Sequence, residues 1–189
     1  MLKPGPRKIV NDVDVDALED IAASARSKPE QATVAYGVAT RWTGQMRSEG
    51  SARPIRLGNG RTIDRQFKIA ADEPEEILGT DAAPNPQELL LAALNACMTV
   101  RYVEGASLRG INLTKLEIET EGTLDLRGLF QLSELVPPGY PAIRYVVRIA
   151  GDGTPRQFEE IHAEVQQVSP NYDSFARSIR MEGELLIED

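Results

Sequence analysis

The feature that most constrains this chain is a long apolar segment, residues 85–104, which would be apolar on nearly every side of a helix. Asn85, Pro86 and Glu88 mark its start, because they suit the N-cap, the first helical position and the third position of a capping box. Gly105 follows the segment and predicts the end of the helix. A helix that is apolar all round is buried, either in a core or against another chain.

The length and composition of the chain limit the class of protein in which this helix can be buried. The chain has 189 residues, of which 41% are hydrophobic and 26% charged, and this suits one globular domain. No run of about 18 apolar residues predicts a transmembrane helix, and the first residues carry no apolar run typical of a secretion signal. We therefore expect a cytoplasmic protein that does not associate with membranes.

Charge and rare residue types exclude several classes of function. The chain has 21 basic and 29 acidic residues, a net charge of −8, which argues against nucleic-acid binding because that needs clustered Lys and Arg. The single cysteine, Cys97, cannot form an intrachain disulfide or a cysteine-based zinc site, and the single histidine, His162, cannot form a multi-histidine site. We expect no metal and no cofactor.

Before the apolar helix, hydrophobic periodicity predicts a short helix followed by strands. Asp16 is expected to cap that helix and Lys28-Pro29 to end it. The Asn59-Gly60 pair predicts a hairpin with positive φ at both turn residues. The expected elements are a helix at 16–26, a half-buried strand at 34–42, a hairpin joining 55–57 to 62–69, and a solvated acidic loop at 71–84.

After the apolar helix, alternating patterns predict further strands and one more helix. Thr154 and Gln157 form a second capping box, and Ser169-Pro170 is expected to stop the helix that they start. The expected elements are a strand at 116–126, a loop at 127–141, a strand at 143–149, a helix at 155–168 and a last strand at 179–187. Antiparallel strands in groups separated by helices indicate the α+β class.

Cys97 admits two interpretations on the residues alone. Free cysteine often packs as a small apolar residue, whereas a reactive thiol needs a nearby cation that stabilises the thiolate. Arg101 lies one turn later and could reach back over Cys97, or it could pair with Glu104. We interpret His162, beside the apolar stripe of its helix, as a packed residue rather than a catalytic one.

The stretch Asp72-Glu-Pro followed by Asn85-Pro-Gln-Glu-Leu-Leu-Leu-Ala-Ala-Leu-Asn-Ala-Cys97 resembles the OsmC/Ohr family, named for osmotically induced protein C and organic hydroperoxide resistance protein. The resemblance is closer to the OsmC-like branch than to the peroxidases. It covers residues 32–189 as one OsmC-like domain and leaves residues 1–31 as an N-terminal extension with a short helix. It implies an α+β, OsmC-like fold assembled as an intertwined homodimer, with central buried Cys-bearing helices wrapped by antiparallel sheets.

In the active members of this family, a first cysteine reacts with an organic hydroperoxide and becomes sulfenic acid. A second cysteine then closes a disulfide, which a dithiol reopens, while an Arg and a Glu prime the first thiolate. By resemblance Cys97 matches the first cysteine, Ser169 stands at the position of the second, and Gln87 stands at the position of the Glu. Arg47 is the best match for the Arg. Its rivals are Arg41 and Arg53.

Helix geometry limits how these residues can meet. Gln87 and Cys97 are about ten residues apart, or about 15 Å along one helix, so a shared pocket would take Gln87 from a partner chain. Three readings stay open. The protein is a one-cysteine thiol peroxidase that uses an external thiol reductant on organic hydroperoxides, a non-catalytic or small-ligand-binding homologue with an inert Cys97, or an enzyme of another class with the same pocket.

Overall fold

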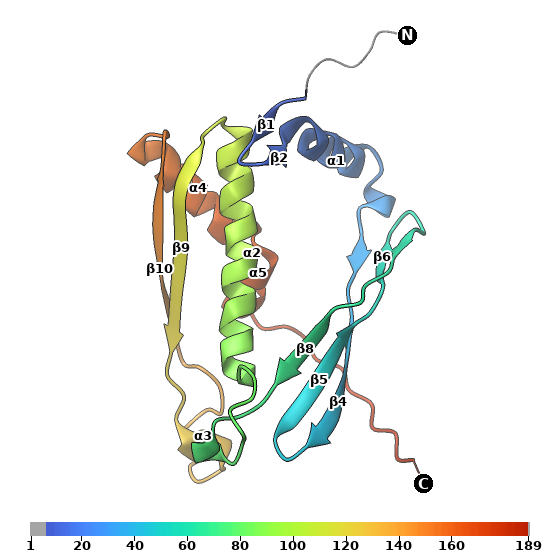
Figure 1. The fold of residues 1–189 in the computed structure, drawn as a ribbon, viewed down its shortest axis with the longest axis vertical. Coiled ribbons are helices and arrows are strands. Elements are labelled where there is room, and N and C mark those ends of the chain that lie inside the picture. The colour runs from blue at the N-terminus through green and yellow to red at the C-terminus, as the bar shows by residue number, and fades with distance from the viewer. Residues whose placement is uncertain (1–6, 189) are drawn as a thin grey trace. The chain divides into compact units, whose positions relative to one another are not determined.

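The computed structural model describes residues 7–188, and the chain divides into two compact units between Ala92 and Ala93. The first unit is built mainly of short strands and holds two three-stranded antiparallel sheets, ordered β3-β6-β7 and β4-β5-β8. Its elements are β1 (Ile9–Val10), β2 (Val13–Asp14), α1 (Val15–Ser27), η1 (Pro29–Gln31), β3 (Val34–Ala35), β4 (Val38–Gly44), β5 (Arg47–Ala52), β6 (Ile55–Leu57), β7 (Thr62–Ile63), β8 (Lys68–Ala71) and η2 (Glu75–Ile77) (Figure 1).

The first helix begins one residue earlier than predicted and has a different cap. The Asp14 carboxylate accepts a hydrogen bond from the backbone N–H of Ala17, so Asp14 is the N-cap. The carboxylate of Asp16, the predicted cap, instead accepts from the backbone N–H of Lys8. The predicted end at Lys28 is confirmed.

The sheet β4-β5-β8 has one charged face and one apolar face. On the charged face Glu49 binds Arg41 at 3.0 Å and Lys68 at 2.9 Å. The other face carries Val38 and Trp42, which are 56% and 76% exposed. The predicted strand 34–42 is interrupted, so that it forms the two separate strands β3 and β4. Its apolar side is exposed, which corrects the prediction that this strand is half-buried.

The predicted hairpin is confirmed, with a different turn. β6 pairs antiparallel with β7, and the backbone N–H of Leu57 donates to the Arg61 carbonyl. Gly60 has a φ of 84°, but Asn59 does not have positive φ, so the turn is not the predicted two-residue type. Its second strand is also broken, because β7 ends at Ile63 and β8 pairs with β5 instead.

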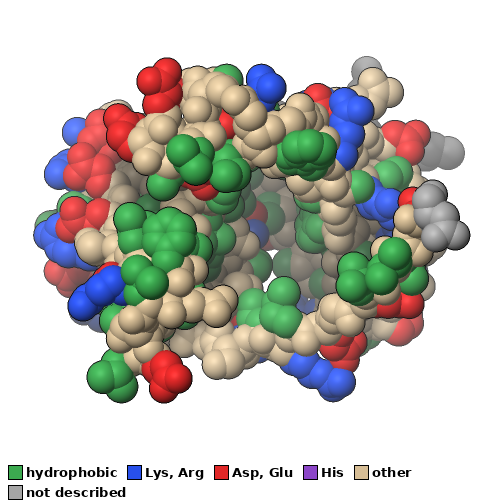
Figure 2. Space-filling view, turned by 90° about the horizontal axis from the view of Figure 1, so that it is seen from below, with side chains coloured by type: hydrophobic (Ala, Val, Ile, Leu, Met, Phe, Trp, Pro, Cys, Tyr) green, Lys and Arg blue, Asp and Glu red, His purple; other side chains and the backbone are tan. Residues whose placement is uncertain are grey.

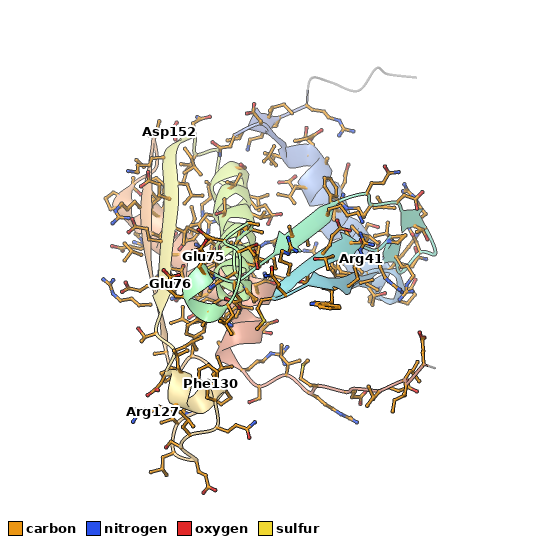
Figure 3. All side chains as sticks on the ribbon, turned by 60° about the horizontal axis from the view of Figure 1, so that its bottom comes forward. Arg41, Glu75, Glu76, Arg127, Phe130 and Asp152 are labelled. Carbon is orange, nitrogen blue, oxygen red and sulfur yellow. The ribbon has the colours of Figure 1, made fainter. Side chains whose placement is uncertain are left out.

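The acidic loop is organised around a buried carboxylate, which corrects the expectation that it is solvated. Asp72 is 1% exposed and accepts hydrogen bonds from the Thr80 hydroxyl at 2.6 Å and from the backbone N–H groups of Glu73, Thr80 and Ala82. Glu75 and Glu76, labelled in Figure 3, are exposed on the same loop. The loop therefore folds around the first acidic side chain and leaves these two in water.

The second unit packs helices against one face of a two-stranded antiparallel sheet, β9-β10. Helix α2 (Pro86–Leu108) crosses the division between the units, and Figure 1 shows it beside the strand β9. A buried stripe on this helix packs against α4 and the inner face of both strands. The stripe consists of Leu94, Met98, Tyr102 and Ala106, and it meets Ile161 and Val165 of α4. The remaining elements are β9 (Leu113–Gly122), α3 (Leu126–Leu129), β10 (Ile143–Gly151), α4 (Pro155–Val168) and α5 (Pro170–Ala176).

The predicted start of α2 is confirmed, but its predicted end is wrong. Asn85 and Glu88 exchange backbone-to-side-chain hydrogen bonds at 2.8 Å, as a capping box requires. Gly105 lies inside the helix, where a Cβ would meet Ile161 of α4 at 3.2 Å, so it permits close helix packing. The helix ends at Leu108, and Gly110, whose φ is +70°, turns the chain away while the N–H of Ile111 donates to the Ala106 carbonyl.

Three predictions about the C-terminal half need correction. The first strand ends at Gly122 rather than at 126, because Asp125 caps the short helix α3, whose Arg127 and the adjacent Phe130 are labelled in Figure 3. Ser169-Pro170 ends α4 as predicted, but it also begins α5. The predicted last strand is absent, since residues 177–188 form no regular structure.

The α+β class is confirmed by this mixture of helices and antiparallel sheets. The predicted capping box at Thr154 is present in full. Within residues 7–188, each helix is too short or too polar to span a bilayer.

Candidate functional site

The sulfur of Cys97 is the centre of a small polar cluster within the second unit. Its Sγ accepts a hydrogen bond from the Ser169 hydroxyl at 3.4 Å and another from the backbone N–H of Asn171 at 3.5 Å. Ser169 is fully buried, whereas Cys97 is half-buried. Residues 72 positions apart in sequence are thus brought into contact.

Local sequence explains how these donors reach the sulfur. Ser169 ends α4 and at the same time caps α5, where its hydroxyl accepts from the backbone N–H of Tyr172 at 3.4 Å. Pro170 occupies the first turn of α5 and suits it, since the missing N–H is not needed there. The Asn171 amide donates to the Ala93 carbonyl at 2.8 Å, which ties the start of α5 to α2.

Two hydrogen-bond donors converge on the sulfur. Sulfur is a weak acceptor when it carries a proton and a stronger one when it does not. The same two donors could bind the oxygen of an oxidised sulfur.

Arg101 adopts the second of its two predicted roles. Its guanidinium pairs with Glu104 at 2.7 Å along the same helix. The charge of Arg101 is therefore engaged by a carboxylate one turn further from Cys97.

Gln87 and Arg47 belong to the first unit, while Cys97 and Ser169 belong to the second. Gln87 lies half-buried in the first turn of α2, and Arg47 is exposed at the start of β5. The rival Arg41 is held by Glu49 on the charged face of its sheet. The structure brings together Cys97 and Ser169, and the roles of Gln87 and Arg47 stay predictions.

His162 packs in the second unit, as its sequence position suggested. Its Nδ1 is hydrogen-bonded to the Tyr102 hydroxyl, and its ring lies 6.1 Å from the ring centres of both Tyr102 and Tyr145. Burial raises the pKa of the Tyr102 phenol above its ordinary range, so the phenol keeps its proton.

Asn171 is a contact of the sulfur that the sequence does not predict, because Ser169-Pro170 is expected only to stop a helix. A Ser followed by Pro also suits the N-cap and first position of a new helix, and this signal predicts α5 and the N–H groups at its start. Among residues 7–188, the structure holds no cluster of three His, Cys, Asp or Glu side chains that could bind a metal.

Comparison with known proteins identifies the family to which this chain is similar. Residues 79–184 match the family model described as OsmC-like protein. The chain is 17% identical to an OsmC-like protein from Mycoplasma pneumoniae, over 75% of this chain and 87% of that one, with a TM-score of 0.59. It is 15% identical to an OsmC-like protein of unknown function from Vibrio cholerae, over 74% and 92%, with a TM-score of 0.52.

These structural matches support the fold. A comparison with curated proteins found no match. The family model covers more than half of the chain and includes α2 with Cys97, the sheet β9-β10 and the helices α4 and α5. The chain therefore belongs to the OsmC-like protein family.

Proposed function

We propose that this protein is a thiol peroxidase that reduces organic hydroperoxides with one cysteine, Cys97, and an external thiol. The Cys97 thiolate attacks the terminal peroxide oxygen, so that an S–O bond forms while the O–O bond breaks. The alkoxide leaves, takes a proton and becomes an alcohol, and Cys97 is left as sulfenic acid. One external thiol then forms a mixed disulfide and releases water, and a second thiol restores Cys97.

The observation that carries this proposal is the pair of hydrogen bonds to the sulfur. Ser169 and Asn171 both donate to Cys97, and a thiolate is the nucleophile in this chemistry. A core cysteine that serves only to fill space has no need of two polar donors. The half-buried position of Cys97 leaves part of the residue open to a substrate.

Ser169 supports the choice of an external reductant. Its hydroxyl contacts the sulfur at 3.4 Å, where a resolving thiol would stand in a two-cysteine relative. A hydroxyl is not ionised near neutral pH and does not displace oxygen from sulfenic acid. The reaction therefore depends on small thiols, and this fits a reducing cytoplasm, where thiols are kept reduced.

We also infer that the working form is a homodimer, because the single chain leaves apolar surfaces open. Val100 on α2 is 51% exposed, although the opposite stripe of this helix is buried. Trp42 on the sheet of the first unit is 76% exposed, and Leu185 in the C-terminal segment is 84% exposed. Figure 2 shows hydrophobic side chains open on one face of the molecule. Apolar exposure on this scale is typical of a surface that another chain covers.

The first experiment measures consumption of cumene hydroperoxide with β-mercaptoethanol as the reductant. The wild-type protein should turn over, and Cys97→Ser should show only the uncatalysed rate. If wild type and Cys97→Ser are equally inactive while folded, then the alternative function, a ligand-binding protein with an inert cysteine, replaces this proposal.

The second experiment places a thiol where the hydroxyl now contacts the sulfur. Ser169→Cys should close an intrachain disulfide after one turnover, so that a dithiol such as dithiothreitol becomes a better reductant than a monothiol. Intact mass and free-thiol counting report the disulfide. A variant that reacts with hydroperoxide yet forms only mixed disulfides would show that the two positions do not cooperate.

A further inference from the structure

A pocket in the second unit lies between β10 and α4, apart from the residues that contact the Cys97 sulfur. Its volume is about 580 Å³, within the range of small-molecule sites. Strand β10 contributes Tyr145 and Ile149, helix α4 contributes Phe158 and His162, and α2 contributes Tyr102. The lining is mostly aromatic and aliphatic, with a few polar atoms.

The polar atoms of this pocket are held in fixed roles. The Tyr102 side chain is 1% exposed and its hydroxyl is bound to Nδ1 of His162. Within residues 7–188, Nδ1 of His162 is the acceptor that the structure gives this buried hydroxyl, so we assign the phenol as the donor and place the imidazole proton on Nε2. The Tyr145 ring stands beside the histidine, and its hydroxyl accepts from the Gln166 amide at 2.8 Å. Nε2–H is therefore the imidazole donor left for an occupant.

The charge of the lining selects among possible occupants. Glu159 is the charged residue in the lining, and neither Lys nor Arg from the described part of the chain belongs to it. An anion in the pocket would meet this carboxylate without a compensating cation, which is unfavourable. An apolar body suits the aliphatic and aromatic walls, and one neutral acceptor suits Nε2–H.

We propose that this pocket binds a small, neutral, mainly apolar carbonyl compound whose oxygen accepts a hydrogen bond from Nε2 of His162. The aromatic walls surround the apolar body, and Tyr102 beneath fixes the tautomer of the histidine. This binding does not depend on the peroxidase chemistry of Cys97.

The test is fluorine NMR titration of the full-length protein with three probes of similar size. Para-fluoroacetophenone carries a neutral carbonyl, para-fluoroethylbenzene lacks it, and para-fluorobenzoate carries a charge. The ketone should bind about tenfold more tightly than the ethylbenzene, the ratio expected for one hydrogen bond, and the benzoate should bind more weakly than the ketone. Equal binding of ketone and ethylbenzene overturns the proposal.

Two variants test the residues. His162→Asn keeps an acceptor for Tyr102 but removes the Nε2 donor, so it should abolish the advantage of the ketone while the ethylbenzene still binds. Glu159→Lys should raise the affinity for the benzoate at least severalfold relative to the ketone. Its matched control, Glu160→Lys, changes the next carboxylate on α4, which is outside the lining. A His162→Asn protein that keeps the ketone preference contradicts the assignment.

Cys97→Ser separates this site from the proposed peroxidase. The serine variant should bind the ketone as the wild type does, whether or not the wild type reduces hydroperoxides. Loss of ketone binding in Cys97→Ser would contradict an independent site.

Discussion

Ser169 performs two roles, one structural and one at the sulfur. Its hydroxyl accepts the N-cap hydrogen bond from Tyr172 and donates to Cys97. A hydroxyl can do both because it has one proton and two acceptor lone pairs. Ser169 is therefore placed both to start α5 and to donate to the sulfur.

Ser169→Ala should lose both interactions. We expect a stability loss of about 1 kcal/mol, typical for removal of an N-cap, together with a severalfold slower reaction of Cys97 with cumene hydroperoxide. Urea unfolding and stopped-flow kinetics measure the two effects. Thr154→Ala is the matched control, because it removes the N-cap of α4 alone. If both variants slow the reaction equally, the hydrogen bond from Ser169 to the sulfur has no role in reactivity.

Asp72 should make stability depend on pH at the acidic end. The Thr80 hydroxyl, followed by backbone N–H groups, lowers the pKa of Asp72 to about 2. Because the folded-state pKa lies below the unfolded value of about 3.9, the carboxylate stabilises the fold above that value. This stabilisation is lost as the pH falls from about 4 to about 2.

Asp72→Asn should therefore be less stable than wild type at pH 7, and the difference should shrink toward pH 2. Urea unfolding over this pH range measures it. Glu76→Gln is the control, an exposed carboxylate on the same loop, and it should leave the curve nearly unchanged. An Asp72→Asn curve that runs parallel to wild type at every pH would contradict this role.

Element starts were predictable from the sequence because their signals are local. Asn85 with Glu88 and Thr154 with Gln157 each fix a helix start within four residues, and both capping boxes form. The prediction that Asp16 caps the first helix is wrong, because Asp14, two residues earlier and of the same type, is the N-cap. The local sequence therefore predicts that a helix starts in this region more reliably than it predicts which residue is the N-cap.

Element ends and the site depend on contacts that the local sequence does not contain. Gly105 suits a helix end, but its lack of a Cβ serves the packing of Ile161 from another helix. The apolar alternation of residues 179–187 predicts a strand, yet no described strand pairs with it. The contact of Cys97 with Ser169 was suggested only by the family resemblance.

Gly110→Ala tests the assignment of the helix end. Gly110 has a φ of +70°, where a Cβ costs about 1 kcal/mol or more, so we expect a loss of that size. Gly110→Asn should lose less, because Asn tolerates this conformation better. Thermal unfolding compares the two. Equal stability of Gly110→Ala and wild type would show that the left-handed turn is not required.

At the scale of the whole molecule, the open apolar surfaces make assembly the main expectation. Val100→Asp places a charge on the exposed side of α2 and should convert a homodimer into monomers or aggregates at micromolar concentration. Ile21→Asp is the control, since Ile21 is 67% exposed on α1, outside the region of family resemblance, and it should leave the dimer intact. Light scattering measures the mass, and a stable wild-type monomer at micromolar concentration would contradict the expectation.

As a one-cysteine peroxidase, the protein should react with hydroperoxide at Cys97, and no thiol of the same chain should resolve the product. The most direct measurement is the intact mass of the protein after one equivalent of cumene hydroperoxide, with and without the sulfenic-acid trap dimedone. We expect the wild type to gain one oxygen, or one dimedone at Cys97 when the trap is present, and Cys97→Ser to gain neither. An unmodified wild-type protein that is folded and has consumed no hydroperoxide would contradict the account.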